Sequence, residues 1–350
     1  MKLLHSWERT LDEYGSLVED RLSNFLGNET EKAVKYHSLI GRVYKDLSDY
    51  MFRAGKRLAS CSVILTYKGF TNRIDDRILN FSIGLELYRH AILVHDDLVD
   101  KDELRRGFQT IHKIYSEEYD SRFGNGLAVF AGNILSAIGQ KALCISGFEP
   151  EKIVRILNMV NDGYQAVNES QILDLLFEYK IPDVDEWYTM ASKRAASLFR
   201  VALSAGAILA NASERDIELL NEAGSHIGYS FDIQDDIIDL FASEEQYGRK
   251  PGGDVLKQKK PLHIVYMYKM ANQKQLGTFE TVVNGKTLKD LTVARKIVSD
   301  CGALEAAKDR SREHAESAKR LLAQTAMNSE TKDFFTSFID YVESSLDWYE

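Results

Sequence analysis

Cysteine and proline are both scarce in this chain of 350 residues. The three cysteines, Cys61, Cys144 and Cys301, are far apart and outside any CxxC pattern. This usage excludes a disulfide framework and a cysteine-based zinc site, and it is typical of reduced thiols in a cytoplasmic protein. The four prolines leave residues 1–149 without any. Because proline disrupts helix interiors, its scarcity permits long helices.

Acidic residues outnumber basic ones, and long apolar runs are also scarce. The formal net charge is −9, and an acidic chain without a basic stripe does not suit binding to nucleic-acid phosphates. The opening residues, MKLLHSWERTLDEYG, lack the apolar core of a signal peptide. The longest apolar run, residues 201–212, is too short to span a bilayer. We therefore expect a cytoplasmic protein with no nucleic-acid partner and no integral membrane segment.

Apolar residues recur at helical spacing along most of the chain, as at Ile83, Leu87, Ala91 and Val94. No convincing alternation of apolar and polar residues indicates strands, and turn-forming clusters separate about ten segments of helical length. No change in composition marks a domain boundary. The sequence therefore predicts an all-α protein with a single domain over residues 1–350.

One acidic pattern occurs twice. DDLVD at residues 96–100 returns as DDIID at residues 235–239, each after an apolar stretch of helical character. In a helix, positions three or four apart share a face, so the aspartates of each copy lie together. One copy alone is typical of a solvated helix end. Two copies, both followed by basic loops, argue against that interpretation.

The chemistry of these patterns indicates a ligand class. Carboxylate clusters that face one another repel unless cations lie between them, and Mg²⁺ typically uses one or two carboxylates together with substrate phosphates. Basic side chains could donate to diphosphate oxygens. Those near the motifs are Lys56, Arg57, Arg89, Arg105, Arg106, Arg249, Lys259 and Lys260. Acid pairs, basic loops and an apolar helical interior together suit a diphosphate head on a hydrocarbon tail.

Three segments resemble the trans-isoprenyl diphosphate synthases, or polyprenyl synthetases. They are DDLVDKDELRRGFQTIH, FDIQDDIIDLF and GYQAVNESQILDL, and the resemblance runs in order from residue 50 or so to residue 265. It implies an antiparallel bundle of helices around a central apolar cavity, and a homodimer. The implied activity is transfer of an allylic group: Mg²⁺ stabilises the departing diphosphate, isopentenyl diphosphate attacks the allylic cation, and the chain grows by one isoprene unit.

The same resemblance implies a role for individual residues. The motif aspartates would bind about three Mg²⁺ ions; they are Asp96, Asp97, Asp100, Asp235, Asp236 and Asp239. Arg105 and Arg194 would join them in catalysis. Substrate contacts are implied for Lys56, Arg57, Arg89, Arg105, Arg106, Gln171, Asp174, Arg194, Asp232, Arg249 and Lys259.

The sequence departs from the family pattern at two places near the first motif. In AGKRLAS, Ala59 and Ser60 stand where GGKRxRP has its second arginine and its proline. Seven residues before Asp96, Arg89 stands in place of the usual histidine or glutamine. One basic donor is lost and one is gained, and we interpret the exchange as compensation around one phosphate.

Further departures lie near the second motif. Arg194 and Ala195 replace the lysine and threonine of KTxxLF, and Asp232 replaces a frequent glutamine. A guanidinium keeps the positive charge of lysine but not its compact geometry. These changes bear on substrate affinity more than on the class of reaction.

Product length is predicted from the residues before Asp96. One helix turn advances about 5.4 Å, close to one isoprene unit. In the family, aromatic residues four or five positions before the motif stop the chain at 15 carbons, but Ile92 and Ala91 stand here. Tyr88, eight positions before, would form a floor one turn lower. This favours geranylgeranyl diphosphate, with 20 carbons, over a 25-carbon product, unless Tyr88 packs between helices and another helix forms the floor.

Two other functions remain open from the sequence. A terpene cyclase on a similar scaffold shares the first motif but has an Asn/Ser/Glu pattern at the second, which the intact DDIID opposes. A non-catalytic or regulatory subunit of a heteromeric prenyltransferase would explain the changes at Ala59, Arg194 and Ala195. An assay of the single chain separates this subunit from an enzyme.

Overall fold

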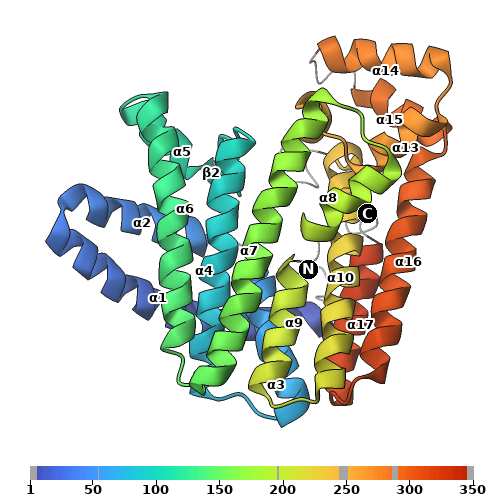
Figure 1. Ribbon diagram of the computed structural model, residues 1–350. Helices are drawn as coiled ribbons and strands as arrows, with labels where there is room; N and C mark the ends of the chain where they lie inside the picture. Colours follow the sequence, from blue (N-terminus) through green and yellow to red (C-terminus); the bar gives the residue numbers. More distant parts are fainter. Residues whose placement is uncertain (1–5, 54, 195–196, 244–250, 286–290, 345–350) are drawn as a thin grey trace. The chain divides into compact units, whose positions relative to one another are not determined.

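The computed structural model describes residues 6–53, 55–194, 197–243, 251–285 and 291–344. Across these residues the chain forms sixteen helices and one small two-stranded sheet (Figure 1). The all-α class predicted from the sequence is confirmed. The number of helices exceeds the predicted ten or so because short helices such as α5 (Ile111–Glu118) and α12 (Gly253–Leu256) form between the long ones.

Contacts group the chain into two compact units. The first comprises Met1–Leu157 with Ala205–Ala212, and the second comprises Asn158–Ser204 with Ser213–Glu350. Two helices contribute residues to both units, namely α7 (Pro150–Tyr179) and α9 (Ser197–Leu209). A single domain around a central apolar cavity stays a prediction.

The first unit is built around α4 (Asp76–Val99), which begins at the N-cap residue Asp75 and ends just before Asp100. Its other elements are α1 (Ser6–Tyr36), α2 (Ser38–Phe52), α3 (Leu58–Thr71), β1 (Leu104–Arg105), β2 (Phe108–Gln109), α5 and α6 (Ser121–Cys144). Most of α4 is buried, and it packs along α6. The helices approach closely because glycines face each other: a Cβ on Gly139 would lie 3.1 Å from the Gly84 carbonyl oxygen.

Helix α6 is apolar and long enough to cross a membrane by length and composition alone. The sequence prediction, made from the run at residues 201–212, overlooked this helix. In the structure it packs against α4 and α5, with Ala128, Ala131 and Leu135 buried. A buried core helix passes the same test, and the contacts of α6 with α4 and α5 are those of such a helix.

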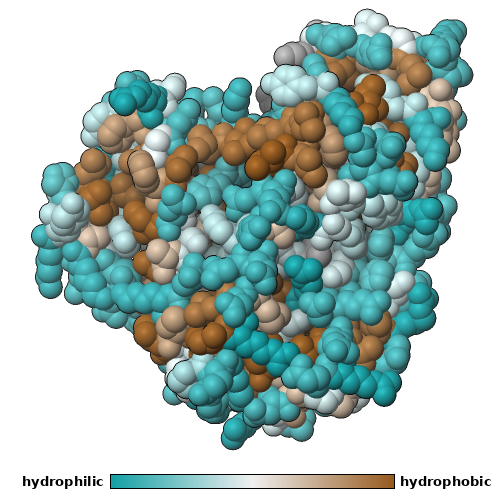
Figure 2. Space-filling model, viewed as in Figure 1, coloured by the Kyte–Doolittle hydropathy of each residue, from teal (hydrophilic) through white to brown (hydrophobic). Residues whose placement is uncertain are grey.

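The second unit contains α8 (Val184–Arg194), α10 (Glu214–Phe241), α12, α13 (Leu262–Met270), α14 (Gln273–Gly285), α15 (Leu291–Asp300), α16 (Ala303–Gln324) and α17 (Ser329–Glu343). It also contains most of α7, where Ile172, Leu175, Leu176 and Tyr179 are exposed. Figure 2 shows apolar side chains on the face of the molecule to which α7 contributes.

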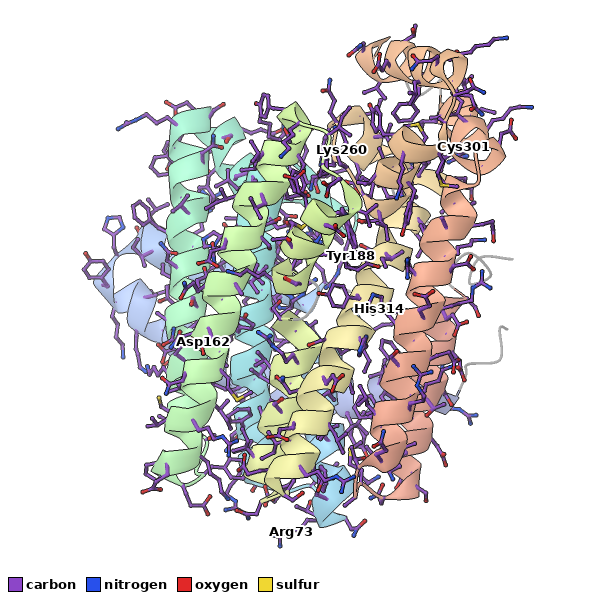
Figure 3. All side chains as sticks on the ribbon, turned by 45° about the vertical axis from the view of Figure 1, so that its right-hand side comes forward. Arg73, Asp162, Tyr188, Lys260, Cys301 and His314 are labelled. Carbon is purple, nitrogen blue, oxygen red and sulfur yellow. The ribbon has the colours of Figure 1, made fainter. Side chains whose placement is uncertain are left out.

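Helix α10 is held along α16 by polar contacts and ring contacts. Gln234 donates to the Ser311 hydroxyl at 3.0 Å. His226 and His314 meet through their Nδ1 atoms at 2.8 Å. The Tyr188 ring of α8 lies 6.0 Å from the His314 ring, and both residues are labelled in Figure 3. These contacts fix the helix that carries the second acidic motif.

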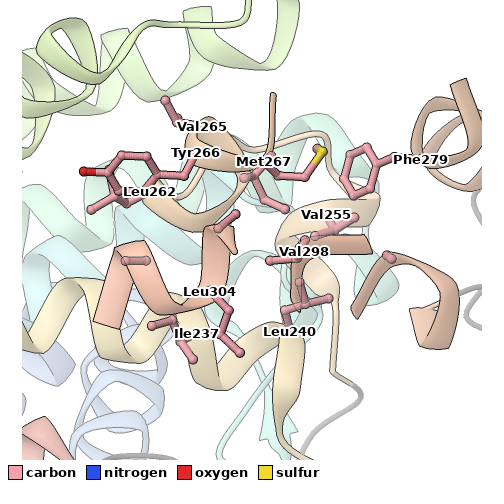
Figure 4. Packing of buried hydrophobic residues seen from close by; sticks show 14 of the residues in the cluster. Ile237, Leu240, Val255, Leu262, Val265, Tyr266, Met267, Phe279, Val298 and Leu304 are labelled. Atoms are coloured by element: carbon pink, nitrogen blue, oxygen red, sulfur yellow. The ribbon is translucent and has the colours of Figure 1, made fainter. Parts of the chain in front are cut away.

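An apolar cluster packs against the end of α10 (Figure 4). Ile237 and Leu240 of α10 pack there with Leu262 and Met267 of α13 and Val298 of α15. Ile237 lies between the acids of DDIID, and Leu240 directly follows the last of them. Burial of these two side chains therefore fixes the orientation of the neighbouring carboxylates.

Candidate active site

The first acidic motif occupies the last turn of α4 and its cap. Asp97 is 1% exposed, whereas Asp96 and Asp100 are half-buried. Both carboxylate oxygens of Asp97 accept hydrogen bonds: one from the Tyr50 hydroxyl at 2.6 Å and one from Arg105 Nε at 2.5 Å. Arg105 also reaches Asp96, with 3.5 Å between Nη2 and Oδ2. The middle acid therefore faces inward, and its two neighbours remain near the surface.

The charges at this motif are coupled. Burial raises the pKa of Asp97 to about 6, although Arg105 and Tyr50 oppose the shift. Burial lowers the pKa of Arg105, but the charges of Tyr50, Asp97 and Asp96 outweigh it and raise this pKa above its ordinary value. A permanently cationic Arg105 is thus held beside two carboxylates.

A tight hairpin folds Arg105 back onto the motif. Strands β1 and β2 pair Arg105 with Phe108, so Arg106 and Gly107 form a two-residue loop. Both have positive φ, 54° and 81°. Two-residue hairpin loops of this geometry favour glycine and are the turns that match the twist of the strands. The RRG sequence therefore suits the geometry of the hairpin as well as the expected chemistry. No strand was predicted from the sequence, so the hairpin corrects that expectation.

Arg106 lies against the loop before α3. Its Nη1 donates to the Arg53 carbonyl oxygen at 2.9 Å. A Cβ on Gly55 would lie 2.5 Å from Arg106 Nη2, so a larger residue at position 55 would displace the guanidinium. Lys56 follows directly, with its ammonium 4.5 Å from the centre of the Trp7 ring. The structure thus brings two of the predicted diphosphate donors, Arg106 and Lys56, to the same loop.

Arg57 has a different environment from Lys56. It is 5% exposed and donates to Glu19 at 3.0 and 2.9 Å and to Glu86 at 3.2 Å. Ser60 donates to the other Glu86 oxygen at 2.8 Å. Arg57 therefore belongs to an internal ion pair that the sequence analysis did not foresee. A contact between Arg57 and substrate stays a prediction, and the ion pairs with Glu19 and Glu86 do not favour it.

The remaining predicted residues of the first unit lie on α4. Arg89 and Ile92 are half-buried, and Ala91 is fully buried. Tyr88 is 4% exposed, and its backbone nitrogen would lie 3.3 Å from a Cβ on Gly139 of α6. Tyr88 therefore belongs to the segment of α4 that contacts α6.

The second acidic motif occupies the last two turns of α10. Asp235 is exposed, Asp236 is half-buried, and Asp239 is 3% exposed. Asp239 accepts the backbone N–H of Asp254 at 3.1 Å on its side chain and that of Gly252 at 2.6 Å on its carbonyl oxygen. The last acid of this copy is therefore bonded to the start of α12.

Arg194, the last residue of α8, gathers three carboxylates. Its Nε and Nη2 donate to Asp232 Oδ2 at 3.1 and 2.6 Å. Its Nη1 donates to Asp174 Oδ1 at 3.3 Å, and its Nη2 lies 3.5 Å from Asp236 Oδ2. Lys259 Nζ lies 3.4 Å from the other Asp174 oxygen. Burial lowers the pKa of Arg194, but Asp232, Asp236 and Asp174 raise it well above its ordinary value.

Burial also acts on Asp236. It raises the pKa of Asp236 well above its ordinary value, against the opposing effect of Arg194 and with the support of Asp232. Gln171 lies one helix turn before Asp174 on α7 and is half-buried. The structure thus brings Asp174, Arg194, Asp232, Asp236 and Lys259 together. Arg249 and Ala195 lie outside the described residues.

Residues 42–301 match the model of the family described as polyprenyl synthetase. The chain belongs to the polyprenyl synthetase family. It is a polyprenyl diphosphate synthase, a prenyltransferase, as the motifs predicted.

Individual relatives of this prenyltransferase differ in their named products. The chain is 27% identical to a geranylgeranyl pyrophosphate synthase of Geoglobus acetivorans, over 93% of this chain and 97% of the relative. It is 33% identical to the farnesyl diphosphate synthase of Bacillus subtilis, over 70% of this chain and 81% of the relative. The family is therefore shown, whereas the product length is not fixed by these relatives.

Solved structures support the fold of the prenyltransferase. Geranylgeranyl pyrophosphate synthase of Corynebacterium glutamicum, complexed with isoprenyl diphosphate and magnesium, superposes with a TM-score of 0.88 at 20% identity, covering 96% of this chain and 99% of that one. Geranylgeranyl pyrophosphate synthetase of Pyrococcus horikoshii gives 0.82 at 23% identity, covering 97% and 99%. The predicted isoprenoid-synthase type of all-α fold is confirmed.

Proposed function

We propose that this prenyltransferase condenses isopentenyl diphosphate with an allylic diphosphate in trans, with Mg²⁺ as cofactor and geranylgeranyl diphosphate as its main product. The observation that carries the proposal is that each DDxxD copy is built with an arginine of its own, Arg105 at the first and Arg194 at the second. Carboxylates for metal and guanidinium for phosphate then stand side by side, as a metal-bound diphosphate requires.

The residues present fit Mg²⁺. The surface acids Asp96, Asp100 and Asp235 offer hard oxygen donors at the ends of two helices. Among the described residues, no three His, Cys, Asp or Glu side chains converge into a cage made by protein alone. Mg²⁺ commonly takes one or two carboxylates and completes its shell with water and substrate phosphates. When bound, it would supply positive charge to the leaving diphosphate.

The chain's own basic groups divide between two diphosphates. Arg106 and Lys56, brought to one loop beside Gly55, are proposed to hold isopentenyl diphosphate together with Arg89. Arg194 and Lys259, both in contact with Asp174, are proposed to hold the allylic diphosphate. Arg105 is oriented by Asp97 and does not need to reorganise when charge develops on the leaving group.

The product length is proposed from α4. Ala91 and Ile92 leave no aromatic barrier in the first turn before the motif. Tyr88 is buried one turn lower, and the Gly84–Gly139 contact brings α4 and α6 within van der Waals distance a further turn away. A tail that follows α4 would meet the Tyr88 ring and then this close helix contact, which favours 20 carbons.

The test uses the purified single chain with Mg²⁺, allylic diphosphates of increasing length and labelled isopentenyl diphosphate. We expect a 20-carbon product from the wild type and longer products from Tyr88→Ala, resolved by chromatography. An unchanged product from the variant would place the floor elsewhere, and a 15-carbon wild-type product would contradict the length assignment. Absence of any product until a second, different chain is added would identify a non-catalytic subunit, and a cyclic hydrocarbon would identify a cyclase.

A homodimer is also proposed. The exposed apolar side chains of α7, Ile172, Leu175, Leu176 and Tyr179, suit burial against another protein surface. The resemblance implies a second copy of this chain, and closed twofold assemblies are the commonest oligomers. Light scattering at micromolar concentration should give twice the chain mass. A monomer mass would contradict the assignment. The cytoplasmic location stays a proposal.

A further inference from the structure

Arg194 and Asp232 are the two ends of one contact, and both depart from the family pattern that the sequence resembles. The pattern that the sequence resembles has a lysine at the first position and frequently a glutamine at the second. Here, Asp232 Oδ2 accepts from both Nε and Nη2 of Arg194, at 3.1 and 2.6 Å. The two exchanges therefore meet in space, although 38 residues separate them in the chain.

The geometry of this contact depends on a guanidinium. Arginine presents five N–H donors in a rigid fork, whereas lysine carries a single ammonium on a flexible stem and has no Nε–H donor. With Nε and Nη2 directed at Asp232, the Arg194 fork turns Nη1 toward Asp174, at 3.3 Å. Lysine at 194 could not make all these contacts with the same orientation.

The charge balance also links the two positions. Aspartate in place of glutamine adds one negative charge beside Asp174 and Asp236, and the arginine–lysine exchange adds no positive charge to offset it. The Asp232 and Arg194 side chains are 21% and 20% exposed, so water screens this charge incompletely. Asp232 would repel a diphosphate unless Arg194 neutralises it.

We propose that Asp232 is a positioning residue that orients the Arg194 guanidinium, so that positions 194 and 232 function as a matched pair, either arginine with aspartate or lysine with glutamine. Asp232 acts through Arg194 and does not itself contact substrate, which replaces the direct substrate contact expected from the sequence. The inference rests on the proposed function, in which Arg194 holds the allylic diphosphate.

A double-mutant cycle tests the pairing. The variants are Asp232→Gln, Arg194→Lys and the double variant with both changes. The first readout is calorimetric binding of inorganic pyrophosphate in the presence of Mg²⁺, and the second is the KM of the allylic substrate against kcat. Each single change should weaken pyrophosphate binding and raise the allylic KM about tenfold, and the double variant should return to within about threefold of the wild type. The KM of isopentenyl diphosphate should stay unchanged.

The neighbouring residue offers a matched control. Lys193, also on α8, forms an ion pair with Glu169 of α7, and both side chains are exposed. Lys193→Arg exchanges one basic side chain for the other, and Glu169→Gln replaces an acid by glutamine. The test variants make the same kinds of change at the neighbouring pair. We expect neither change, alone or combined, to affect pyrophosphate binding.

Two results would overturn the pairing. In the first, the double variant loses pyrophosphate binding by the product of the two single effects. In the second, Asp232→Gln alone leaves pyrophosphate binding unchanged. Thermal unfolding without ligand separates loss of fold from loss of binding. If the coupling is observed but the wild type forms no prenyl product, the proposed function fails and the pairing stands. If product forms without coupling, the pairing alone fails.

Discussion

The two copies of DDxxD have the same spacing but different structures around them. In the first, the middle acid, Asp97, is buried and bonded to Tyr50 and Arg105. In the second, the last acid, Asp239, is buried and bonded to backbone N–H groups at the start of α12. The arginine of the first copy follows eight residues later through a hairpin.

The second copy obtains its arginine from another helix. Arg194 lies on α8 and precedes Asp236 by 42 residues. Helical periodicity places the three acids of each copy on one side of their helix, but the neighbouring elements decide which acid faces the interior. The difference teaches that equivalent letters of a repeated motif need not have equivalent roles. The first position, Asp96 or Asp235, is not fully buried in either copy: Asp96 is half-buried and Asp235 is exposed.

The largest effect should therefore come from the first position of each copy. Asp96→Ala and Asp235→Ala should each lower kcat by about three orders of magnitude or more, because metal charge carries much of the leaving-group stabilisation. Circular dichroism should show unchanged helix content. Activity that no longer depends on Mg²⁺ in either variant would contradict the metal assignment.

The variant Arg89→Ala tests whether Arg89 holds isopentenyl diphosphate and not the allylic substrate. Arg89→Ala removes a charged donor worth about 1.5–3 kcal/mol, so the KM of isopentenyl diphosphate should rise about tenfold or more. The KM of the allylic substrate should change little, because its proposed donors, Arg105, Arg194 and Lys259, do not include Arg89. A rise confined to the allylic substrate would show that Arg89 does not compensate for the arginine missing at Ala59. Steady-state kinetics with each substrate varied in turn decides.

Much of this organisation could be predicted from the sequence. Sparse proline and helical periodicity predicted the all-α class, and the spacing of the acids with RRG predicted the family. The burial of Asp97 and Asp239 could not be predicted, because the three acids of a copy look alike until neighbouring elements pack. Gly107 alone was a weak indication of the hairpin at Arg106–Gly107. Arg57 was interpreted as a surface donor because its partner, Glu86, lies 29 residues away in the sequence.

Tyr50 was missed for a similar reason, since a tyrosine 47 residues before an acid carries no local signal. The Tyr50 hydroxyl donates to the buried carboxylate of Asp97. Among the contacts described above, no tyrosine donates to Asp239, the buried acid of the second copy. Tyr50→Phe should lower the free energy of unfolding by about 1–3 kcal/mol, because it leaves a buried acceptor with one partner fewer. Denaturant unfolding measures the loss. Tyr229→Phe is the control in the second unit, and an equal loss there would show that the effect is not particular to Asp97.

The smallest expected effect concerns pH and the helix that carries the second copy. The Nδ1 atoms of His226 and His314 lie 2.8 Å apart, so one proton serves both, and a second would place two positive rings in contact. Burial lowers the pKa of both rings, and His226 lowers that of His314 further, to about 4. A pKa depressed from about 6.5 means that the folded state prefers neutral rings, so their contribution is present above pH 6.5 and is lost as the pH falls toward 4.

The first unit should respond to acid in the same direction. Burial also lowers the pKa of His90 in α4 to about 4, so acid should weaken both units in the wild type. His314→Phe keeps a ring against Tyr229, which stacks on His314 at 4.6 Å, and removes one of the two basic nitrogens. The free energy of opening at α10 amides, measured by hydrogen exchange, should fall between pH 7 and pH 5 in both proteins. The fall should be about 1 kcal/mol smaller in the variant than in the wild type, allowing for partial solvent screening. The α4 amides, which retain His90, should keep the wild-type pH dependence. Parallel wild-type and variant curves at α10 would show that the histidine pair does not titrate with folding, and an equal change at α4 would show that the effect is not confined to the helix of the second motif.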